Sequence, residues 1–326
     1  MRWLLRILPW LVPLLLILTL GIFFVIGLRV PERWTTQVWG GGFIGDRITL
    51  APFPPFSTAR VFSTQNPSVD LPSHFYLLGS DAGGRDLLAL TARGAIPSLE
   101  LVALALIARM LIGVVAGLAI AAGAQPVRTV ARAAGGWIAG FPYLALAVLV
   151  IQAFTGGPSP IAIPGRARLL GFVAAIAIVG WRDIAELVAS RIEWVNTQPF
   201  ALGARAVGSQ GLGFFHRHVW PFLRPALAIE FSFQASAVLV LLAELGFLQY
   251  YLGGFTAIVE DQGLGTATAY RLANQPELGQ LLSDVRVYAI RQQLAAALVP
   301  ALALALMALA FELLARALRG RAALRS

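Results

Sequence analysis

The chain of 326 residues contains no cysteine and no lysine. The absence of cysteine excludes disulfides, cysteine-ligated zinc, iron–sulfur clusters and a thiol nucleophile. The absence of lysine excludes a Schiff-base lysine and the lysine with which a P-loop contacts phosphates. If a nucleotide drives the work of this protein, a separate subunit must therefore bind it.

Charge is also scarce, at 13% of residues against 58% hydrophobic residues and a mean hydropathy of +0.76. About a quarter of the residues of a soluble protein are charged. The apolar residues come in blocks of roughly 20, the length an α-helix needs to cross about 30 Å of hydrocarbon. This predicts an all-α polytopic membrane protein with six transmembrane helices. The spans are expected at residues 3–28, 96–122, 136–154, 169–190, 225–248 and 294–318.

The distribution of arginine predicts the orientation of these spans. The net charge is +9, and all 25 positive charges are arginine. Arginines in short loops and at chain ends mark the cytoplasmic side. With six spans, Arg2, Arg6, Arg128, Arg132 and the C-terminal arginines all fall on one side. Both termini and the segment between the fourth and fifth spans are therefore expected in the cytoplasm. The arginine excess is attributed to topology and contact with membrane lipid, not to nucleic acid.

The chain divides into four predicted regions. The first apolar run is too long for a secretory signal peptide and is followed by no small-x-small cleavage site, so it is expected to remain as an anchor. Residues 86–93 carry apolar residues at helical spacing and are expected to lie in the membrane interface. The regions are an N-terminal anchor helix (1–29), an extracytoplasmic loop with this interfacial helix (30–95), a core of five transmembrane helices with a cytoplasmic loop at 191–224 (96–318), and a cytoplasmic tail (319–326).

A glycine-rich, basic stretch, TQPFALGARAVGSQGLGFFHRHVWPFLRP (197–225), lies between the fourth and fifth spans. Thr197 is a suitable N-cap, and Pro199 falls in the first turn, where its missing N–H costs nothing. A short helix is expected at 200–207. Gly208 suits the left-handed position that ends a helix.

A second helix is expected from Ser209 to Trp220, with Pro221 breaking the pattern. This predicts a helix–sharp turn–helix unit on the cytoplasmic face, although an ordinary connecting loop is the alternative. The two histidines of this segment do not indicate a metal site. His216 and His218 are two apart, so on a helix they point in nearly opposite directions.

The segment resembles the cytoplasmic EAA loop of ABC-transporter permease subunits. Their pattern is roughly E-A-A-x-x-x-G, nine residues, then I-x-L-P, with R-H-x-L-P common in peptide importers. Here L-G-A-R-A-V-G (202–208) is followed by nine residues and then by H-V-W-P. Leu202 replaces the family's glutamate and Gly203 its first alanine. The resemblance implies that Leu202, Gly203, Ala204, Arg205, Ala206, Val207, Gly208 and Pro221 form a coupling helix that docks on an ATPase subunit.

Three further stretches narrow the resemblance. LGSDAGGRDLLALTARGA (78–95) is similar to the L-G-T-D-x-x-G-R-D-x-x-S-R-x-x-x-G-A segment of dipeptide, oligopeptide and nickel importer permeases of the C-subunit type. AELGFLQYYLGG (243–254) loosely resembles their A-E-A-x-L-S-F-L-G-L-G. PELGQLLSDVR (276–286) resembles their P-x-W-G-x-M-L-x-x-x-R. Four motifs in the family's order extend over about three quarters of the chain.

This resemblance implies a type I importer permease in a bacterial inner membrane. The partners it implies are a second, B-type permease subunit, two ATPase subunits and an extracytoplasmic substrate-binding protein. ATP and Mg would be bound by the ATPase subunits, so no cofactor is expected in this chain. The cargo expected is a di- or oligopeptide, although nickel or another solute stays open.

Two ionisable residues within the predicted spans are candidate pore-lining groups. Arg109 lies in the middle of the second span and Glu244 near the outer end of the fifth. Charges within the bilayer usually face protein or water. An arginine buried against a neighbouring subunit is the alternative for Arg109. A proton-coupled secondary transporter that uses Arg109 and Glu244 as a charge relay is the alternative function.

Overall fold

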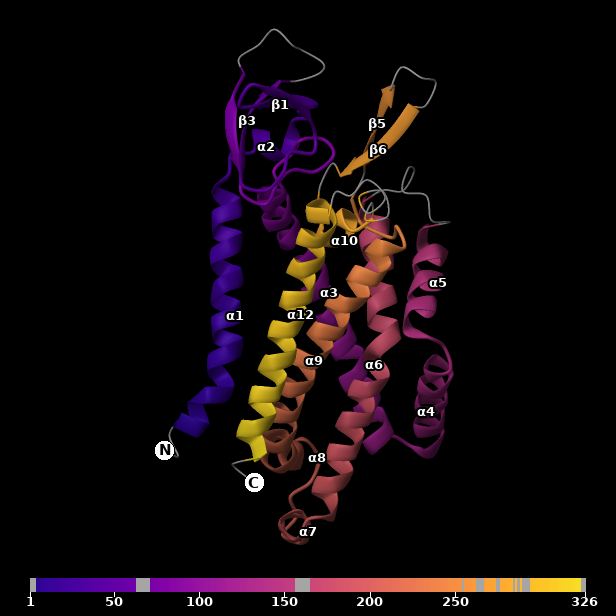
Figure 1. Cartoon of the computed structure of the whole chain (residues 1–326). Coiled ribbons are helices and arrows are strands. Elements are labelled where there is room, and N and C mark those ends of the chain that lie inside the picture. Colours follow the sequence, from indigo (N-terminus) through magenta and orange to yellow (C-terminus); the bar gives the residue numbers. More distant parts are fainter. Residues whose placement is uncertain are drawn as a thin grey trace.

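The computed structural model describes residues 4–62, 71–155, 165–253, 255–261, 267–273, 276–283, 285, 288 and 294–323. Its helices are α1 (Leu4–Arg29), α2 (Arg33–Thr36), α3 (Leu87–Ala122), α4 (Gln125–Ala139), α5 (Tyr143–Thr155), α6 (Gly165–Thr197), α7 (Pro199–Ala206), α8 (Gly211–Phe214), the π-helical turn η1 (Phe215–Val219), α9 (Trp220–Phe247), α10 (Leu278–Leu281) and α12 (Leu294–Ala323). The long helices run side by side (Figure 1). Both chain ends lie at the same end of the bundle as α7 and α8.

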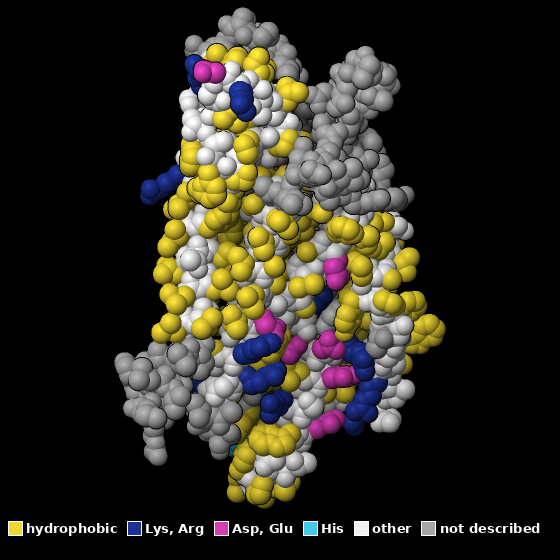
Figure 2. Space-filling view, viewed as in Figure 1, with side chains coloured by type: hydrophobic (Ala, Val, Ile, Leu, Met, Phe, Trp, Pro, Cys, Tyr) yellow, Lys and Arg dark blue, Asp and Glu magenta, His cyan; other side chains and the backbone are white. Residues whose placement is uncertain are grey.

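Four helices in the described part of the chain are long and apolar enough to cross a membrane, or five if the bent pair α4–α5 is one span. Helix α6 has 33 residues but is charged in its second half, at Arg182, Asp183 and Glu186. Apolar side chains cover the middle of the bundle (Figure 2). The predicted helical, multi-pass membrane fold is confirmed. The predicted start of the first span, residue 3, lies outside the described residues.

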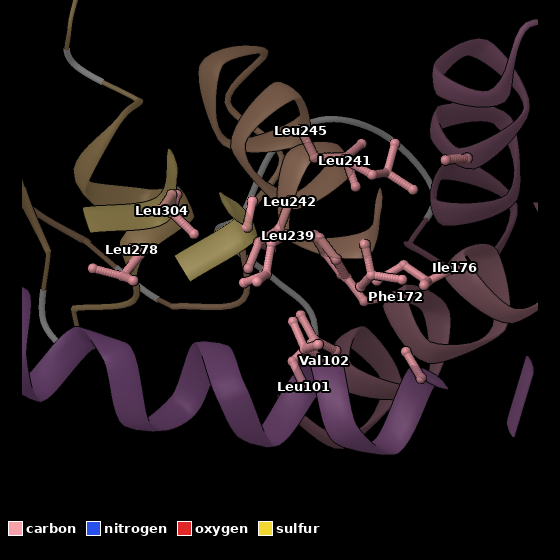
Figure 3. Close-up of a cluster of buried hydrophobic side chains, with 14 of the residues drawn as sticks. Leu101, Val102, Phe172, Ile176, Leu239, Leu241, Leu242, Leu245, Leu278 and Leu304 are labelled. Atoms are coloured by element: carbon pink, nitrogen blue, oxygen red, sulfur yellow. The ribbon is translucent and has the colours of Figure 1, made fainter. Parts of the chain in front are cut away.

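A close contact between α3 and α6 organises the bundle. A methyl group added at Gly113 or Gly117 of α3 would lie 2.6 Å from the side chain of Ile184 or Val188 of α6. Small residues let helices approach in a membrane, where van der Waals packing drives association. A buried cluster continues this contact toward the end of the bundle opposite α7 and α8, which we call the outer end (Figure 3). It includes Leu101 and Val102 of α3, Phe172 and Ile176 of α6, Leu239, Leu242 and Leu245 of α9, Leu278 of α10 and Leu304 of α12.

The third predicted span, 136–154, is not one straight helix. Helices α4 and α5 meet at 100°, on either side of Gly140 and Pro142. Proline has no N–H for the helical ladder and disfavours the α conformation in the residue before it. Helix α5 therefore begins only after Pro142 and has 13 residues.

The outer segment contains a sheet that the sequence patterns did not predict. In β3 the side chains alternate between a buried and a more exposed face, and Ala59 and Val61 are fully buried. These residues pack with Trp34, Phe53 and Tyr76. The strands β1 (Gly41–Ile44), β2 (Arg47–Leu50), β3 (Ser57–Phe62) and β4 (Ser73–Tyr76) form one antiparallel sheet in the order β2-β1-β3-β4, and β5 (Phe255–Asp261) pairs with β6 (Ala267–Ala273).

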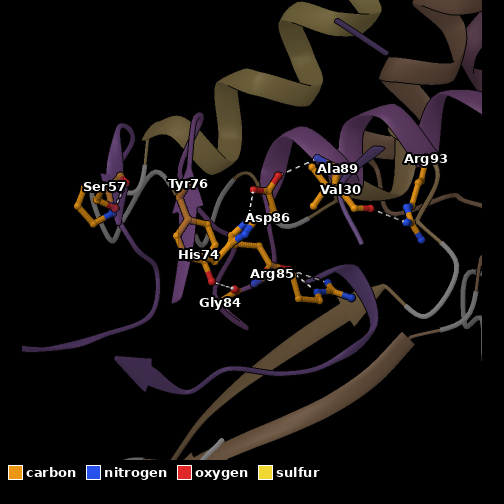
Figure 4. A network of polar contacts seen from close by, with 11 residues as sticks. Val30, Ser57, His74, Tyr76, Gly84, Arg85, Asp86, Ala89 and Arg93 are labelled. Atoms are coloured by element: carbon orange, nitrogen blue, oxygen red, sulfur yellow. Dashed lines mark hydrogen bonds and ion pairs between the residues drawn. The ribbon is translucent and has the colours of Figure 1, made fainter. Parts of the chain in front are cut away.

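Residues 86–93 do not form the separate interfacial helix that was expected. Asp86 caps α3, and its Oδ1 accepts the N–H of Ala89 at 2.8 Å. Its Oδ2 lies 2.8 Å from Nε2 of His74 in β4 (Figure 4). Residues 87–92 are all buried. An interfacial helix leaves one face to lipid, whereas here a neighbouring helix covers this part of α3, with Gly27 of α1 against it.

The single turn α10 is inserted among the outer ends of α3, α9 and α12. Leu278 is fully buried, and its N–H donates to Oγ of Ser98 in α3 at 2.9 Å. On α9, Gly246 lies directly against the backbone of Gly279. These contacts close the outer end of the bundle around α10.

Substitution of Gly246 by alanine is expected to lower the melting temperature of the detergent-solubilised protein. The added methyl group would lie 2.2 Å from the carbonyl oxygen of Gly279, and overpacking of this kind costs about 1–3 kcal/mol. Gly320→Ala in α12 is the control, because nothing lies within 4 Å of its Cβ position. An unchanged melting temperature for Gly246→Ala would contradict the close contact of α9 with α10.

Candidate functional site

The candidate site begins where α6 ends. Thr197 was expected to cap the next helix but is the last residue of α6, and its hydroxyl donates to the carbonyl of Trp194 at 2.8 Å. The N-cap is Gln198, in an extended conformation. Pro199 occupies the first turn, as predicted. Helix α7 is therefore displaced by one residue from the expected 200–207.

Gly208 ends α7 in the predicted left-handed conformation, with φ of +87°. Its N–H donates to the carbonyl of Arg205, and the N–H of Ser209 donates to the carbonyl of Ala204, both at 3.0 Å. This pair of bonds is the Schellman arrangement, which satisfies carbonyls at a helix end. The chain consequently reverses sharply after α7.

The second helix differs from the expectation at both ends. Its N-cap is Gln210, not Ser209. The sequence predicts a break at Pro221, but α8, η1 and α9 form one continuous helix, Gly211–Phe247. The π turn η1 directly precedes Pro221, and a wider turn moves the carbonyl that the proline ring would otherwise meet. Pro221 itself is exposed in the first turn of α9.

The small residues of α7 pack against the rest of the chain. Ala201 is fully buried and Ala204 is half-buried against the same apolar cluster. Ala204 therefore packs partly against its own chain. Leu202, Gly203, Arg205, Ala206, Val207 and Gly208 are exposed. The cluster comprises Ile184, Val188, Ile192 and Val195 of α6, Ala201 of α7, Phe214 of α8, Val219 of η1 and Leu223 of α9.

Arg109 ties three helices together inside the bundle. It is buried in α3, and its Nε donates to the carbonyl of Ile176 in α6 at 2.8 Å. Its Nη1 donates to Oε1 of Gln234 in α9 at 2.6 Å. A methyl group at Gly180 would lie 2.3 Å from the guanidinium carbon. Neither Gln234 nor Gly180 stood out in the sequence, because neither belongs to a charged pattern or motif.

Glu244 occupies a different environment from Arg109. It is exposed near the outer end of α9, on a face that also exposes Val240 and Phe247. Gln234, the partner of Arg109 on α9, precedes Glu244 by 244 − 234 = 10 residues, or about 15 Å of helix. The structure therefore does not bring the two candidate pore residues together.

A buried carboxyl group holds the loop after α9 at the outer end. Glu277 is 1% exposed, and its Oε1 accepts the N–H of Leu252 at 2.9 Å. The carbonyl of Leu252 accepts from Nη1 of Arg168 in α6 at 2.9 Å. Oε2 of Glu277 has no hydrogen-bond partner within the described ranges. Burial raises the pKa of Glu277 to about 7, against the opposing effects of the Leu252 bond and the Arg168 charge.

Comparison with known proteins shows what the chain is similar to. No family model matches the chain. The dipeptide transport system permease protein DppC of Alkalihalophilus pseudofirmus is 27% identical over 285 residues, which are 83% of this chain and 80% of that protein. A crystal structure of an amino acid ABC transporter with histidines has a TM-score of 0.48 and 19% identity, over 70% of this chain and 91% of that one.

The chain is therefore similar in sequence to an ABC-transporter permease, and its helical bundle is that of a multi-pass membrane protein. The resemblance to dipeptide, oligopeptide and nickel importer permeases, predicted from four motifs, is thereby confirmed. The relative is a dipeptide permease, and the similarity extends over most of both chains.

Replacement of Glu277 by glutamine is expected to flatten the pH dependence of stability. The pKa of about 7 in the folded protein exceeds the ordinary value of 4.5, so the folded state binds this proton more tightly than the unfolded chain. The contribution of Glu277 is therefore full below pH 4.5 and is lost as the pH rises toward 7. Melting temperatures at pH 5 and pH 8 measure the difference.

The glutamine variant keeps an oxygen that can accept the Leu252 N–H but cannot ionise. Its melting temperature is expected to fall less between the two pH values than that of the wild type. Glu32→Gln is the control, because that side chain is 77% exposed on the same side of the molecule. Equal pH slopes for wild type and Glu277→Gln would contradict the raised pKa.

Proposed function

We propose that the chain is the permease subunit of an ATP-driven importer, forming half of a heterodimeric pore with a B-type permease subunit. Two ATPase subunits bind ATP and Mg on the cytoplasmic side, and a substrate-binding protein delivers the cargo outside. The protein resides in a bacterial inner membrane with both termini in the cytoplasm. The observation that carries the proposal is α7, a short exposed helix held at the far end of α6 by the turn at Gly208.

The length of α6 supports the role of α7. Its 33 residues extend for about 50 Å, whereas the hydrocarbon layer is about 30 Å thick. Helix α7 follows immediately and is therefore expected outside the lipid. A short helix with small exposed residues such as Gly203 fits a groove on a partner protein.

The outer half of α9 supports a pore shared with a second subunit. A carboxylate within a membrane span is unfavourable against lipid, so such groups usually face protein or water. The face of α9 that carries Glu244, Val240 and Phe247 is uncovered by the described part of this chain. A second permease subunit and a water-filled path would cover it. Peptide is the proposed cargo because the relative is a dipeptide permease.

Transport would follow from movement of α7. Closure of the ATPase subunits on ATP displaces α7, and the apolar cluster that α7 shares with α6 and α9 transmits this displacement to those helices. Packed helices respond as rigid bodies, which rock between inward-facing and outward-facing arrangements. The chain supplies the coupling and the path, and its partners supply hydrolysis.

A proton-coupled transporter finds no specific support. That mechanism needs Arg109 and Glu244 to exchange charge, but the guanidinium is bonded to Ile176 and Gln234. A bonded, buried arginine of this kind is a structural tie between helices.

The orientation can be tested by cysteine labelling, since the chain has no cysteine of its own. Ser73→Cys, exposed in β4, is expected to react with an impermeant maleimide in intact cells. Gln210→Cys, exposed between α7 and α8, is expected to react only after permeabilisation. Reaction of both residues from outside would contradict the proposed orientation.

The docking role of α7 can be tested at Gly208. A β-branched residue with φ of +87° is strained by about 1–2 kcal/mol, and nothing within 4 Å of the Cβ position adds a clash. Gly208→Val is expected to reach the membrane at normal levels but to lose its ATPase subunits on purification and to lose uptake.

Gly213→Ala is the matched control, because that glycine also has nothing within 4 Å and lacks a positive φ. It is expected to retain the ATPase subunits and the uptake rate. If Gly208→Val also retains both at wild-type values, α7 is an ordinary loop and the proposed coupling is wrong.

A further inference from the structure

Three large apolar side chains are exposed near the end of α7. Leu202 is 55% exposed, Val207 85% and Leu212 87%. They come from α7, its C-cap and α8, and we call them the apolar tip. Figure 2 shows apolar side chains at this end of the molecule, beyond a band of basic and acidic side chains.

Lipid is not the expected cover of the apolar tip. The charged residues Arg182, Glu186 and Glu193 occupy the second half of α6, and charges of this density are found outside the hydrocarbon layer. The tip lies still farther along the chain, beyond the end of α6. Large apolar side chains that project into water in this way indicate a protein partner.

The charge nearest to the tip is engaged within the chain. Nη2 of Arg205 donates to Oδ1 of Asn196 at 2.6 Å. Its guanidinium carbon also lies 4.8 Å from the centre of the Phe214 ring, which is a cation–π contact. The tip itself carries no carboxylate, because Leu202 stands where related loops have glutamate. It therefore offers no anion to a cationic residue of a partner.

We infer that the ATPase groove receiving α7 is apolar where Leu202 enters, and that burial of the apolar tip, not an ion pair, holds the two subunits together. This inference rests on the proposed function. Salt screens an exposed ion pair, since the Debye length falls from about 10 Å at 0.1 M to about 3 Å at 1 M. Burial of apolar surface is not weakened by such screening. The association should therefore resist salt.

The test uses the assembled transporter purified from its own membranes, with the ATPase retained per permease measured in NaCl from about 0.05 to 0.5 M, a range that strongly changes screening. Wild-type retention is expected to change less than about twofold across this range. Leu202→Ala is expected to lower retention about fivefold at both salt concentrations, through lost apolar burial. Leu202→Glu is expected to lower it further, because an unpaired carboxylate would enter the groove. Val130→Ala, at a residue of α4 that is 68% exposed, is the control and should retain the ATPase normally.

The outcomes separate this inference from the proposed function. A wild-type association that weakens about tenfold or more with salt, or that Leu202→Glu strengthens, overturns the apolar docking but leaves α7 as the docking helix. Normal retention in Leu202→Ala together with normal retention in Gly208→Val overturns docking through α7 itself. Loss in Leu202→Ala at both salt concentrations, with the Val130→Ala control unchanged, supports the inference.

Discussion

The contact between α3 and α6 is the constraint on which the rest of the structure depends. Gly113 and Gly117 leave no room for a side chain at this contact, and Gly180 leaves none beside the Arg109 guanidinium. Because the helices approach so closely, Arg109 can reach the backbone carbonyl of Ile176 and satisfy its charge inside the bundle. The same contact packs α6 against the core, and α6 continues past it to α7. The burial of the Arg109 charge therefore depends on the close packing of α3 and α6.

Much of the membrane fold and the turn of the candidate site could be predicted from sequence. An apolar run of about 20 residues is long enough to cross a membrane, and in lipid a helix satisfies its backbone hydrogen bonds internally. Four of the predicted spans therefore coincide with α1, α3, α9 and α12. Gly208 was predictable because a left-handed helix end has a strong preference for glycine. Rules of this kind depend only on neighbours in the chain, and the structure therefore confirms the predictions made from them.

Predictions failed where distant residues decide the structure. The strand β3 contains only six residues, STARVF. Its alternating pattern indicates a buried face only because Trp34 and Tyr76, from elsewhere in the chain, pack against that face. Pro221 breaks an isolated helix, but a π turn before it removes the conflict. The packing of Ala204 on its own chain could not be predicted, because helical periodicity alone does not tell which face meets the core. The hydrogen-bond partners of Arg109 lie 67 and 125 residues away in the chain and could not be predicted from sequence either.

The unbroken helix from Gly211 to Phe247 has a mechanical consequence. Its 37 residues make a rod of about 55 Å, which starts beside α7 and ends where Gly246 touches α10. A rod of this length acts as a lever: a tilt of about 5° at one end moves the other by about 5 Å, roughly one helical turn. The irregular turn η1 lies at the end of this helix that is beside α7. A small tilt applied at the α7 end would therefore become a larger displacement at the α10 end.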